Sequence, residues 1–341
     1  MFKRLVQVFG VLVVIAIGVL ALGPLLIPAG SIQPEGSARA AATADSRFLT
    51  IPLAGTRGLD VHYLERPADH QATAGTGDLA FLLMHGFTFN SFTWDAVMTP
   101  LAQFGRIVAY DQIPYGLSAK PIAGDWNGEN PYAKESIIAQ VGAVIQGLGL
   151  DHTILVGNSS GGSLALEAAL AYPQRVAGLI LVAPWVYAER PTVPEAVAEL
   201  PQLRRLSLLL ARKLGNPTLL EYSYQDPSHI PQARKDLAVI HTRVANWDLA
   251  WGELLDRSLT SSVDIGTRLA QVRVPVLLIT ADRDKLVKPE DTRRVAQALP
   301  NATLRVLPNC GHVPQEECPQ AFMAAVTDWL ASTFARPPTG R

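Results

Sequence analysis

The sequence has little charge and almost no cysteine. Its 341 residues include 2 cysteines, 29 lysines and arginines, and 30 aspartates and glutamates, which gives a formal net charge of −1 at pH 7. Two cysteines exclude a small fold held together by several disulfides, and the lack of a basic excess argues against nucleic acid as the main partner. Histidine and cysteine are scattered without the spacing of metal ligands, so we expect neither a metal nor another cofactor.

Charge is missing altogether from one long stretch near the N-terminus. The run from Leu5 to Ile27 follows Lys3 and Arg4, and about 20 residues at a rise of 1.5 Å each span the hydrocarbon core of a bilayer. We therefore expect residues 1–28 to form a membrane anchor, with the two basic residues in the cytoplasm and the remainder exported. The alternative is a secretory signal, cleaved near residues 38–40, that leaves a secreted protein.

From Arg47 onward, short β-branched or aliphatic runs alternate with helical stretches. The middle runs are apolar without alternation, which is typical of parallel strands buried on both faces. The pattern predicts an α/β domain over residues 47–336 with a mostly parallel sheet, preceded by a linker at 29–46 that is rich in Ala, Gly, Ser and Pro. The expected strands are 48–51, 59–64, 79–84, 106–110, 153–156, 178–182, 274–280 and 302–307.

Residues 186–265 interrupt this alternation. They contain six prolines among helical patterns such as 203–214 and 236–255, and we interpret them as a helical insertion within the same domain. Ligands bind at the carboxyl ends of the strands in open α/β sheets. An insertion there would form the roof of the binding site.

The strongest chemical signal follows the expected strand at 153–156. The sequence Gly157-Asn158-Ser159-Ser160-Gly161 fits G-x-S-x-G, a sharp strand-to-helix turn that exposes a serine nucleophile at a helix N-terminus. The glycines let the two backbones approach without a Cβ clash. Ser160 is a competing hydroxyl, but only Ser159 has the flanking glycines in register, so we predict Ser159 as the nucleophile.

A serine nucleophile needs a base and an orienting acid, which follow it in the order Ser, Asp or Glu, His. Of the later histidines, His229 and His241 fall within the insertion, whereas His312 follows the last expected strand and can reach back over the sheet. We predict His312 as the base. The loop after the strand at 274–280 offers Asp282 and Asp284 as the acid, and both remain open at this point.

The oxyanion that develops on an attacked carbonyl needs hydrogen-bond donors. We expect one from the backbone N–H of Ser160 and the other from the loop after the strand at 79–84, where Phe87 is the natural candidate. His85 in the same loop precedes the nucleophile in the chain. We therefore expect His85 to brace the loop rather than to act as the base.

Together these motifs resemble the α/β-hydrolase superfamily, of the capped type that includes esterases, lipases, carbon–carbon hydrolases of meta-cleavage pathways, proline iminopeptidases and cofactor-free haloperoxidases. The resemblance implies an eight-stranded, mostly parallel sheet with helices on both faces and a helical cap. It also implies Asp284 as the acid, because the family's acid ends a G-x-x-D stretch, although Ala281 replaces the glycine here. The matching stretches are 84–87 with 92–94, 110–121, 157–162, 282–284 and 311–319.

Ser159 excludes the dehalogenases and epoxide hydrolases of this fold, which use aspartate at the elbow. We expect a membrane-tethered serine hydrolase that cleaves carboxylic esters through an acyl-enzyme intermediate. The alternatives are hydrolysis of a carbon–carbon bond of meta-cleavage type and a non-catalytic protein of the same fold that binds a ligand.

Aromatic residues in and beside the insertion predict a site for the apolar acyl group of a small-molecule substrate, or else form the core of the lid. They are Trp185, Tyr187, Trp247 and Trp251. The basic amphipathic stretch 203–214 is either an ordinary lid helix or a surface that rests on the membrane. Cys310 and Cys318 either form a disulfide, as an exported protein permits, or remain two small apolar residues.

Overall fold

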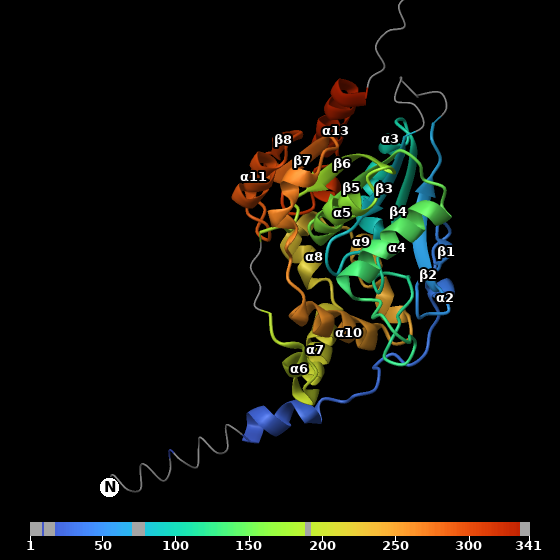
Figure 1. The fold of residues 1–341 in the computed structure, drawn as a ribbon, viewed down its shortest axis with the longest axis vertical. Coiled ribbons are helices and arrows are strands. Elements are labelled where there is room, and N and C mark those ends of the chain that lie inside the picture. The colour runs from blue at the N-terminus through green and yellow to red at the C-terminus, as the bar shows by residue number, and fades with distance from the viewer. Residues whose placement is uncertain (1–8, 10–17, 70–78, 188–191, 335–341) are drawn as a thin grey trace, which may run out of the picture.

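An eight-stranded sheet forms the centre of the protein. The computed structural model describes residue 9 and residues 18–69, 79–187 and 192–334, and its strand order is β1-β2-β4-β3-β5-β6-β7-β8 (Figure 1). The pairs β1–β2 and β2–β4 are antiparallel, and the other pairs are parallel. The expected strands are confirmed, with ends that differ by no more than two residues. The observed bounds are β1 (Arg47–Ile51), β2 (Leu59–Arg66), β3 (Ala80–Met84), β4 (Arg106–Tyr110), β5 (Thr153–Asn158), β6 (Val176–Val182), β7 (Val276–Ala281) and β8 (Ala302–Leu307).

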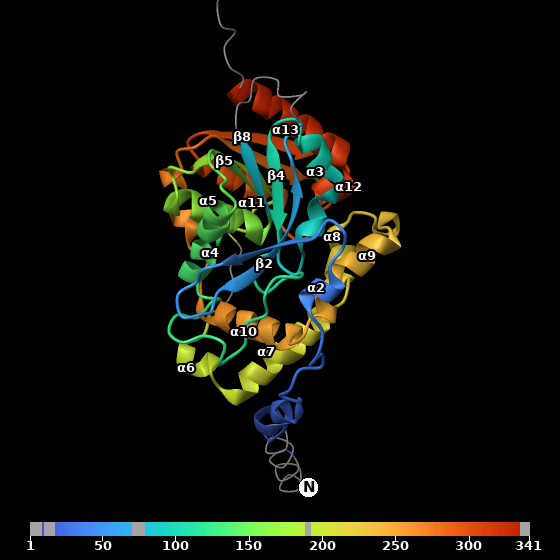
Figure 2. The same ribbon diagram turned by 90° about the vertical axis from the view of Figure 1, so that its right-hand side faces the viewer.

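The sheet is buried on both faces, which explains why its central strands are apolar without alternation. In β3, Leu82 and Met84 belong to one layer of the core, whereas Phe81 and Leu83 belong to the other. Figure 2 shows helices on either side of the strands. The first face is covered by α4 (Lys134–Gly147), α5 (Ser160–Ala171) and α11 (Pro289–Ala298), and the second by α3 (Asp95–Leu101) and α13 (Pro319–Phe334).

The chain between β6 and β7 forms helices at one end of the sheet, where the sequence predicts a cap. The carbonyl of Ser223 in this region accepts a hydrogen bond from His312, which follows β8, so the cap lies at the carboxyl end of the strands. Two of its helices, α7 and α10, pack against each other (Figures 1 and 2). The described cap elements are α6 (Glu195–Ala198), α7 (Pro201–Leu214), α8 (Thr218–Ser223), η3 (Pro227–His229), α9 (Gln232–Ala238), η4 (Ile240–Arg243) and α10 (Trp247–Thr260).

Short elements complete the fold around this frame. Two of them matter for the site because they flank it: η2 follows the loop after β3, and α12 follows the loop after β8. The short elements are η1 (Gly23–Leu26), α2 (Ala38–Ala41), η2 (Ser91–Trp94), η5 (Ile265–Thr267), η6 (Leu269–Gln271) and α12 (Pro314–Glu317).

Residues 29–46, expected as a linker, lie against the cap and the first strands. The carbonyls of Gln33 and Gly36 accept hydrogen bonds from the cap backbone, and the carboxylate of Asp248 in α10 accepts bonds from Ser31 and Ile32. Helix α2 contacts η4. Hydrogen bonds to the cap therefore fix this segment, although its composition is that of a free linker.

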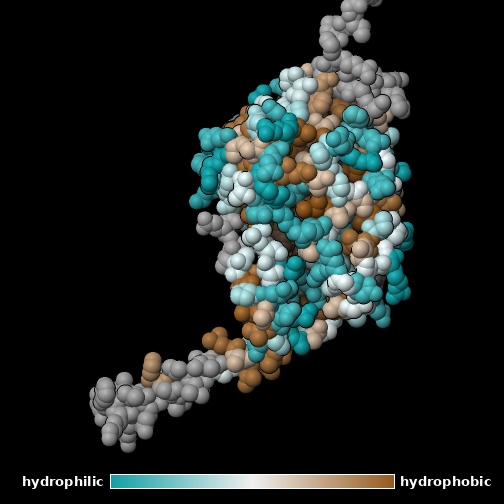
Figure 3. Space-filling model, viewed as in Figure 1, coloured by the Kyte–Doolittle hydropathy of each residue, from teal (hydrophilic) through white to brown (hydrophobic). Residues whose placement is uncertain are grey.

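Most of the expected anchor at residues 1–28 lies outside the described residues. In the part of the chain that the structure describes, no helix combines the length and the apolar character needed to cross a membrane. The described end of the apolar run contains η1, which packs against α7. Figure 3 shows hydrophobic side chains gathered where this N-terminal segment meets the body.

Candidate active site

Ser159 occupies the sharp turn between β5 and α5. Its backbone angles are φ 55° and ψ −120°, a strained conformation for a residue with a side chain. A Cβ added to Gly157 would lie 2.4 Å from the carbonyl oxygen of Gly161, and one added to Gly161 would lie 2.4 Å from that of Met84. Both positions therefore require glycine, and the turn places Ser159 directly before the first residue of α5.

His312 and Asp284 meet above the carboxyl end of the sheet. Nδ1 of His312 lies 2.8 Å from Oδ2 of Asp284, and both side chains are buried. Oδ1 of Asp284 accepts backbone hydrogen bonds from Leu286 and Val287 at 2.8 and 2.9 Å, which fixes the carboxylate. Because a carboxylate only accepts, this network assigns the histidine proton to Nδ1 and leaves Nε2 able to take up a proton.

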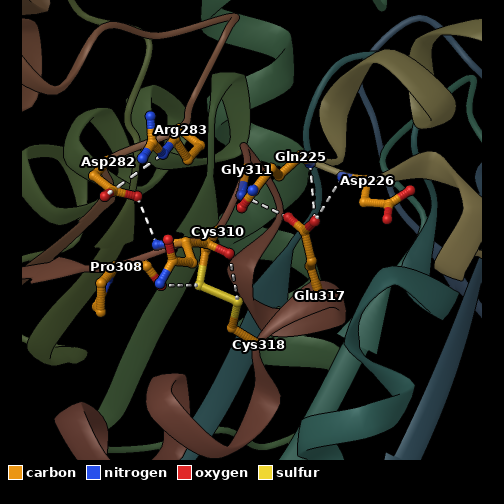
Figure 4. Close-up of a disulfide and its surroundings, with 10 residues drawn as sticks. Gln225, Asp226, Asp282, Arg283, Pro308, Cys310, Gly311, Glu317 and Cys318 are labelled. Atoms are coloured by element: carbon orange, nitrogen blue, oxygen red, sulfur yellow. Dashed lines mark hydrogen bonds and ion pairs between the residues drawn. A yellow bond between two sulfur atoms is a disulfide. The ribbon is translucent and has the colours of Figure 1, made fainter.

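Asp282, the other candidate for the acid, stabilises its own loop. Oδ1 accepts a hydrogen bond from the backbone N–H of Asn309 at 2.7 Å, and Oδ2 lies 3.8 Å from Nε of Arg283 (Figure 4). Its side chain is 39% exposed. The geometry thus separates the two aspartates that the motif order left open, and it pairs His312 with Asp284.

The loop that carries His312 is held by a disulfide and by a hydrogen bond from the residue before Ser159. A disulfide joins Cys310 to Cys318 across the loop (Figure 4), so these cysteines are paired rather than free. The carbonyl of His312 accepts a hydrogen bond of 3.1 Å from Nδ2 of Asn158, the neighbour of Ser159. Within the described chain Ser159 Oγ makes no hydrogen bond to the His312 ring, and catalytic hydrogen bonds often tighten only when substrate binds.

The same loop is attached to the cap. The backbone N–H of His312 donates to the carbonyl of Ser223 at 2.7 Å. Glu317 accepts hydrogen bonds from the N–H of Gly311 at 2.5 Å and from those of Gln225 and Asp226 at 2.9 and 3.2 Å (Figure 4). These bonds to a charged acceptor are strong, so the cap helps to position the histidine. The role of Glu317 could not be predicted from the sequence, because a single acidic residue near a loop has no distinctive spacing.

The loop after β3 lies beside the nucleophile. A Cβ added to Gly86 would be 3.2 Å from Cβ of Ser159, which places the next residue, Phe87, close to the elbow. The backbone N–H groups of Phe87 and Ser160 donate to no protein acceptor in the described ranges. Both predicted oxyanion donors are therefore available to a substrate carbonyl.

His85 braces this loop, as the sequence predicts. Its Nε2 accepts a hydrogen bond of 3.0 Å from the backbone N–H of Gln112, so Nδ1 carries the proton and donates to the carbonyl of Gly86 at 2.8 Å. Burial lowers the pKa of His85 below its ordinary value, which keeps the ring neutral. Both ring nitrogens are occupied, and His85 has no nitrogen left for base catalysis.

Two of the predicted substrate-binding residues, Trp247 and Trp251, lie on α10 of the cap, where this helix meets the oxyanion loop. Both are buried in a cluster with Tyr115, against which Phe87 packs. The ring centroids of Tyr115 and Trp251 are 5.5 Å apart. A packed aromatic cluster therefore joins the oxyanion loop to α10.

The other two predicted residues occupy different surroundings. The backbone N–H of Trp185 donates to the carbonyl of Ser159 at 3.0 Å, so Trp185 is fixed next to the nucleophile. Tyr187 packs against the core on the α5 side of the sheet, and the guanidinium of Arg294 lies 4.0 Å from its ring centroid. The structure does not bring Tyr187 together with the two tryptophans of α10.

His241 is a buried group that sequence analysis assigned only to the insertion. Its ring stacks on Trp251 at 4.3 Å, and burial lowers its pKa to about 3. Its Nε2 has no hydrogen-bond partner among the residues that the structure describes, and the residue lines a small cavity with Thr88 and Phe89, just beyond the oxyanion loop. Across the described residues, no group of three or more His, Cys, Asp or Glu is placed to hold a metal ion.

Residues 80–319 match the family model of the alpha/beta hydrolase fold. The chain belongs to this family. Lipase 1 of Psychrobacter immobilis is 27% identical over 256 residues, which are 73% of this chain and 77% of that protein. The 2-hydroxy-6-oxo-2,4-heptadienoate hydrolase of Pseudomonas putida is 28% identical over 246 residues, 70% of this chain and 83% of that protein.

Solved structures agree with this assignment at the level of the fold. An esterase from Thermogutta terrifontis superposes with a TM-score of 0.64 at 21% identity, covering 84% of this chain and 99% of the esterase. The protein is a hydrolase of the α/β-hydrolase fold, and it is similar to lipases and to meta-cleavage hydrolases.

Proposed function

We propose that this α/β-hydrolase cleaves carboxylic esters of apolar acyl groups through an acyl-enzyme intermediate. The observation that carries the proposal is the Asp284–His312 pair, held by Asn158 beside a serine elbow. Near this elbow, the backbone N–H groups of Phe87 and Ser160 have no acceptor among the described residues. This arrangement supplies a nucleophile, a base with a fixed tautomer and an oxyanion site, which together suffice for acyl transfer.

In the proposed reaction, Ser159 Oγ attacks the ester carbonyl while Nε2 of His312 takes up the hydroxyl proton. The N–H groups of Phe87 and Ser160 bind the resulting oxyanion. When the carbon–oxygen bond breaks, His312 returns the proton to the leaving alcohol, and the acyl group stays on the serine. Water then attacks with the same assistance and releases the acid. Asp284 keeps the proton on Nδ1 and stabilises the imidazolium ion of each step.

The buried aromatic wall formed by Tyr115, Trp247 and Trp251 supports an apolar acyl group as the substrate feature. A second candidate is hydrolysis of a carbon–carbon bond in a vinylogous diketone, which the similarity to the meta-cleavage relative favours. The same catalytic residues would serve it, so the bond that is cleaved must be determined with substrates.

We also propose that the catalytic domain is exported and remains attached to a membrane through residues 1–28. The uncharged run behind Lys3 and Arg4 supports this location. The Cys310–Cys318 disulfide supports export as well, because disulfides persist in oxidising compartments. Secretion after cleavage of the N-terminal segment is the alternative, and the mass of the mature N-terminus distinguishes the two.

The decisive experiment is labelling with a serine-directed fluorophosphonate, combined with p-nitrophenyl esters of increasing chain length. The wild type should be labelled and should turn over these esters. Ser159→Ala should do neither, whereas the matched control Ser160→Ala should retain both properties, since only the backbone of Ser160 is used. Turnover of a vinylogous diketone but of no ester would favour the second candidate. A wild type that is neither labelled nor active, or an active Ser159→Ala variant, would contradict the proposal.

A further inference from the structure

The outer surface of the cap is unusually apolar next to the N-terminal segment. In the cap, Leu200, Leu206, Leu209 and Leu210 are each 38–49% exposed. Residues 19–32 add Val19, Leu20, Leu22, Leu25, Leu26 and Ile32, which are 41–85% exposed. Figure 3 shows this hydrophobic surface at the junction of the two segments. Soluble proteins rarely expose a contiguous apolar surface unless it binds something.

Helix α7 is apolar on two opposite faces. Leu208 and Ala211 are buried on the inner face, where α7 packs on α10 and Ala211 contacts the tryptophan cluster. Leu206, Leu209 and Leu210 lie on the outer face, where a lid helix on the protein surface would normally carry polar residues. Packing of the inner face accounts for the core of the cap. It does not account for the exposed leucines on the outer face.

The N-terminal segment is bonded directly to this helix. Gln202 and Arg205 donate hydrogen bonds of 3.0 Å to the carbonyls of Ala21 and Ile27. Arg212 donates to the carbonyls of Pro28 and Gly30 at 3.1 and 2.6 Å. The end of the uncharged run at Ile27 is therefore fixed against α7, and a membrane-embedded run would hold α7 at the bilayer surface.

The charges on α7 suit an anionic lipid surface. The helix contains four basic residues and no acidic residue. Arg204 pairs with Glu253 and Asp256, and Arg212 pairs with Asp248. Arg205 and Lys213 pair with no carboxylate in the described part of the protein. Basic side chains beside an apolar face are the composition of helices that lie in the membrane interface.

We propose that the outer face of α7, together with residues 19–32, lies in the interface of an anionic bilayer, and that the ester substrate is a lipid of that bilayer. The occupant is lipid rather than a second protein because residues 19–27 of this surface are the end of the uncharged sequence from Leu5 to Ile27, which is long enough to span a bilayer. The substrate part rests on the proposed ester hydrolase function. The position of α7 supports this part of the proposal. Helix α7 packs on α10, and the tryptophans of α10 belong to the cluster against which Phe87 of the oxyanion loop packs.

The contact with lipid can be measured on the full chain in vesicles of phosphatidylethanolamine and phosphatidylglycerol. Both natural cysteines are in the disulfide, so a cysteine introduced as Leu209→Cys takes up a thiol-reactive fluorophore alone. Val306→Cys on β8 is the matched control, because Val306 is 41% exposed and Leu209 38%. Lipids with a nitroxide high on the acyl chain should quench at least half of the fluorescence at position 209 and little at 306. Equal quenching at both positions, or crosslinking of two chains through position 209 without lipid quenching, would overturn the proposal.

The substrate can be tested in the same vesicles with a fluorogenic phospholipid and a soluble short-chain p-nitrophenyl ester. Leu209→Glu with Leu210→Glu should lower phospholipid turnover at least tenfold and leave soluble ester turnover within about twofold, whereas Val306→Glu should change neither. Unchanged phospholipid turnover in the double variant, or no phospholipid turnover by a wild type that cleaves the soluble ester, would overturn the lipid proposal. If the wild type cleaved neither ester, the proposed hydrolase function itself would fail. The quenching experiment would still test whether the outer face of α7 contacts lipid.

Discussion

The assignment of the acid can be tested with two aspartates only two positions apart. In Asp284→Asn, the amide oxygen should remain toward the N–H groups of Leu286 and Val287, because an amide NH2 cannot face two donors. The amide NH2 would then donate to Nδ1 of His312. The histidine proton would move to Nε2, and the base could no longer accept the proton of Ser159.

The expected result is a fall in kcat of about four orders of magnitude, the loss that this tautomer causes in a serine protease, or about 5 kcal/mol of activation free energy. Asp282→Asn is the matched control. Its amide oxygen can still accept the hydrogen bond from Asn309, so ester turnover should stay within about twofold of the wild type. Stopped-flow assays with a p-nitrophenyl ester measure both variants, and circular dichroism checks their fold. A large loss for the Asp282 variant with little change for Asp284→Asn would refute the reasoning.

Three further predictions concern stability, each measured by denaturant titration. Changing both cysteines to serine should lower the free energy of unfolding by about 2–3 kcal/mol, because the disulfide closes a short loop in the unfolded chain; an equal effect of reductant on wild type and variant would contradict this. Arg234→Met should cost about 3–5 kcal/mol, since it removes the guanidinium that pairs with the buried carboxylate of Glu316 at 2.7 and 2.9 Å and leaves that charge without a cation, and adding Glu316→Gln should recover part of the loss. The pKa of His241 falls from 6.5 to about 3 on folding, so the unfolded chain binds the proton more readily and stability is lost as the pH falls. Between pH 7 and pH 4 the wild type should lose about 3 kcal/mol relative to His241→Phe.

The sheet and the elbow could be predicted from the sequence because local pattern and tertiary environment agree there. Strands such as β3 and β5 are buried on both faces, and apart from Thr153 and Asn158 at the two ends of β5 they contain only apolar residues and glycine, so the apolar runs mark them clearly. Gly157 and Gly161 are required by backbone contacts within a few residues of Ser159 and with β3. These constraints restrict the residue types at each position, so they can be recognised in the sequence.

Other parts of the site depend on contacts between distant segments, which composition does not encode. Glu317 binds backbone atoms of the cap some ninety positions earlier in the chain. Motif order alone does not separate Asp282 from Asp284, although the family resemblance implies Asp284. Residues 29–46 have the composition of a free linker, yet Asp248 of α10 binds two of them. Such pairings follow only from the folded arrangement.

The connection between the cap and the histidine loop uses backbone atoms on the cap side. Ser223 contributes its carbonyl, Gln225 and Asp226 contribute N–H groups, and the carbonyls of Tyr224 and Gln225 accept from Lys285. The side chain of Gln225 can therefore vary without moving His312, whereas Tyr224 is also held by its side chain, which packs with Val313 and donates to Glu316. Evolution or an engineer can alter the substrate range through the cap by substitution, whereas an insertion or deletion between residues 223 and 226 would displace His312 and stop turnover of every substrate alike.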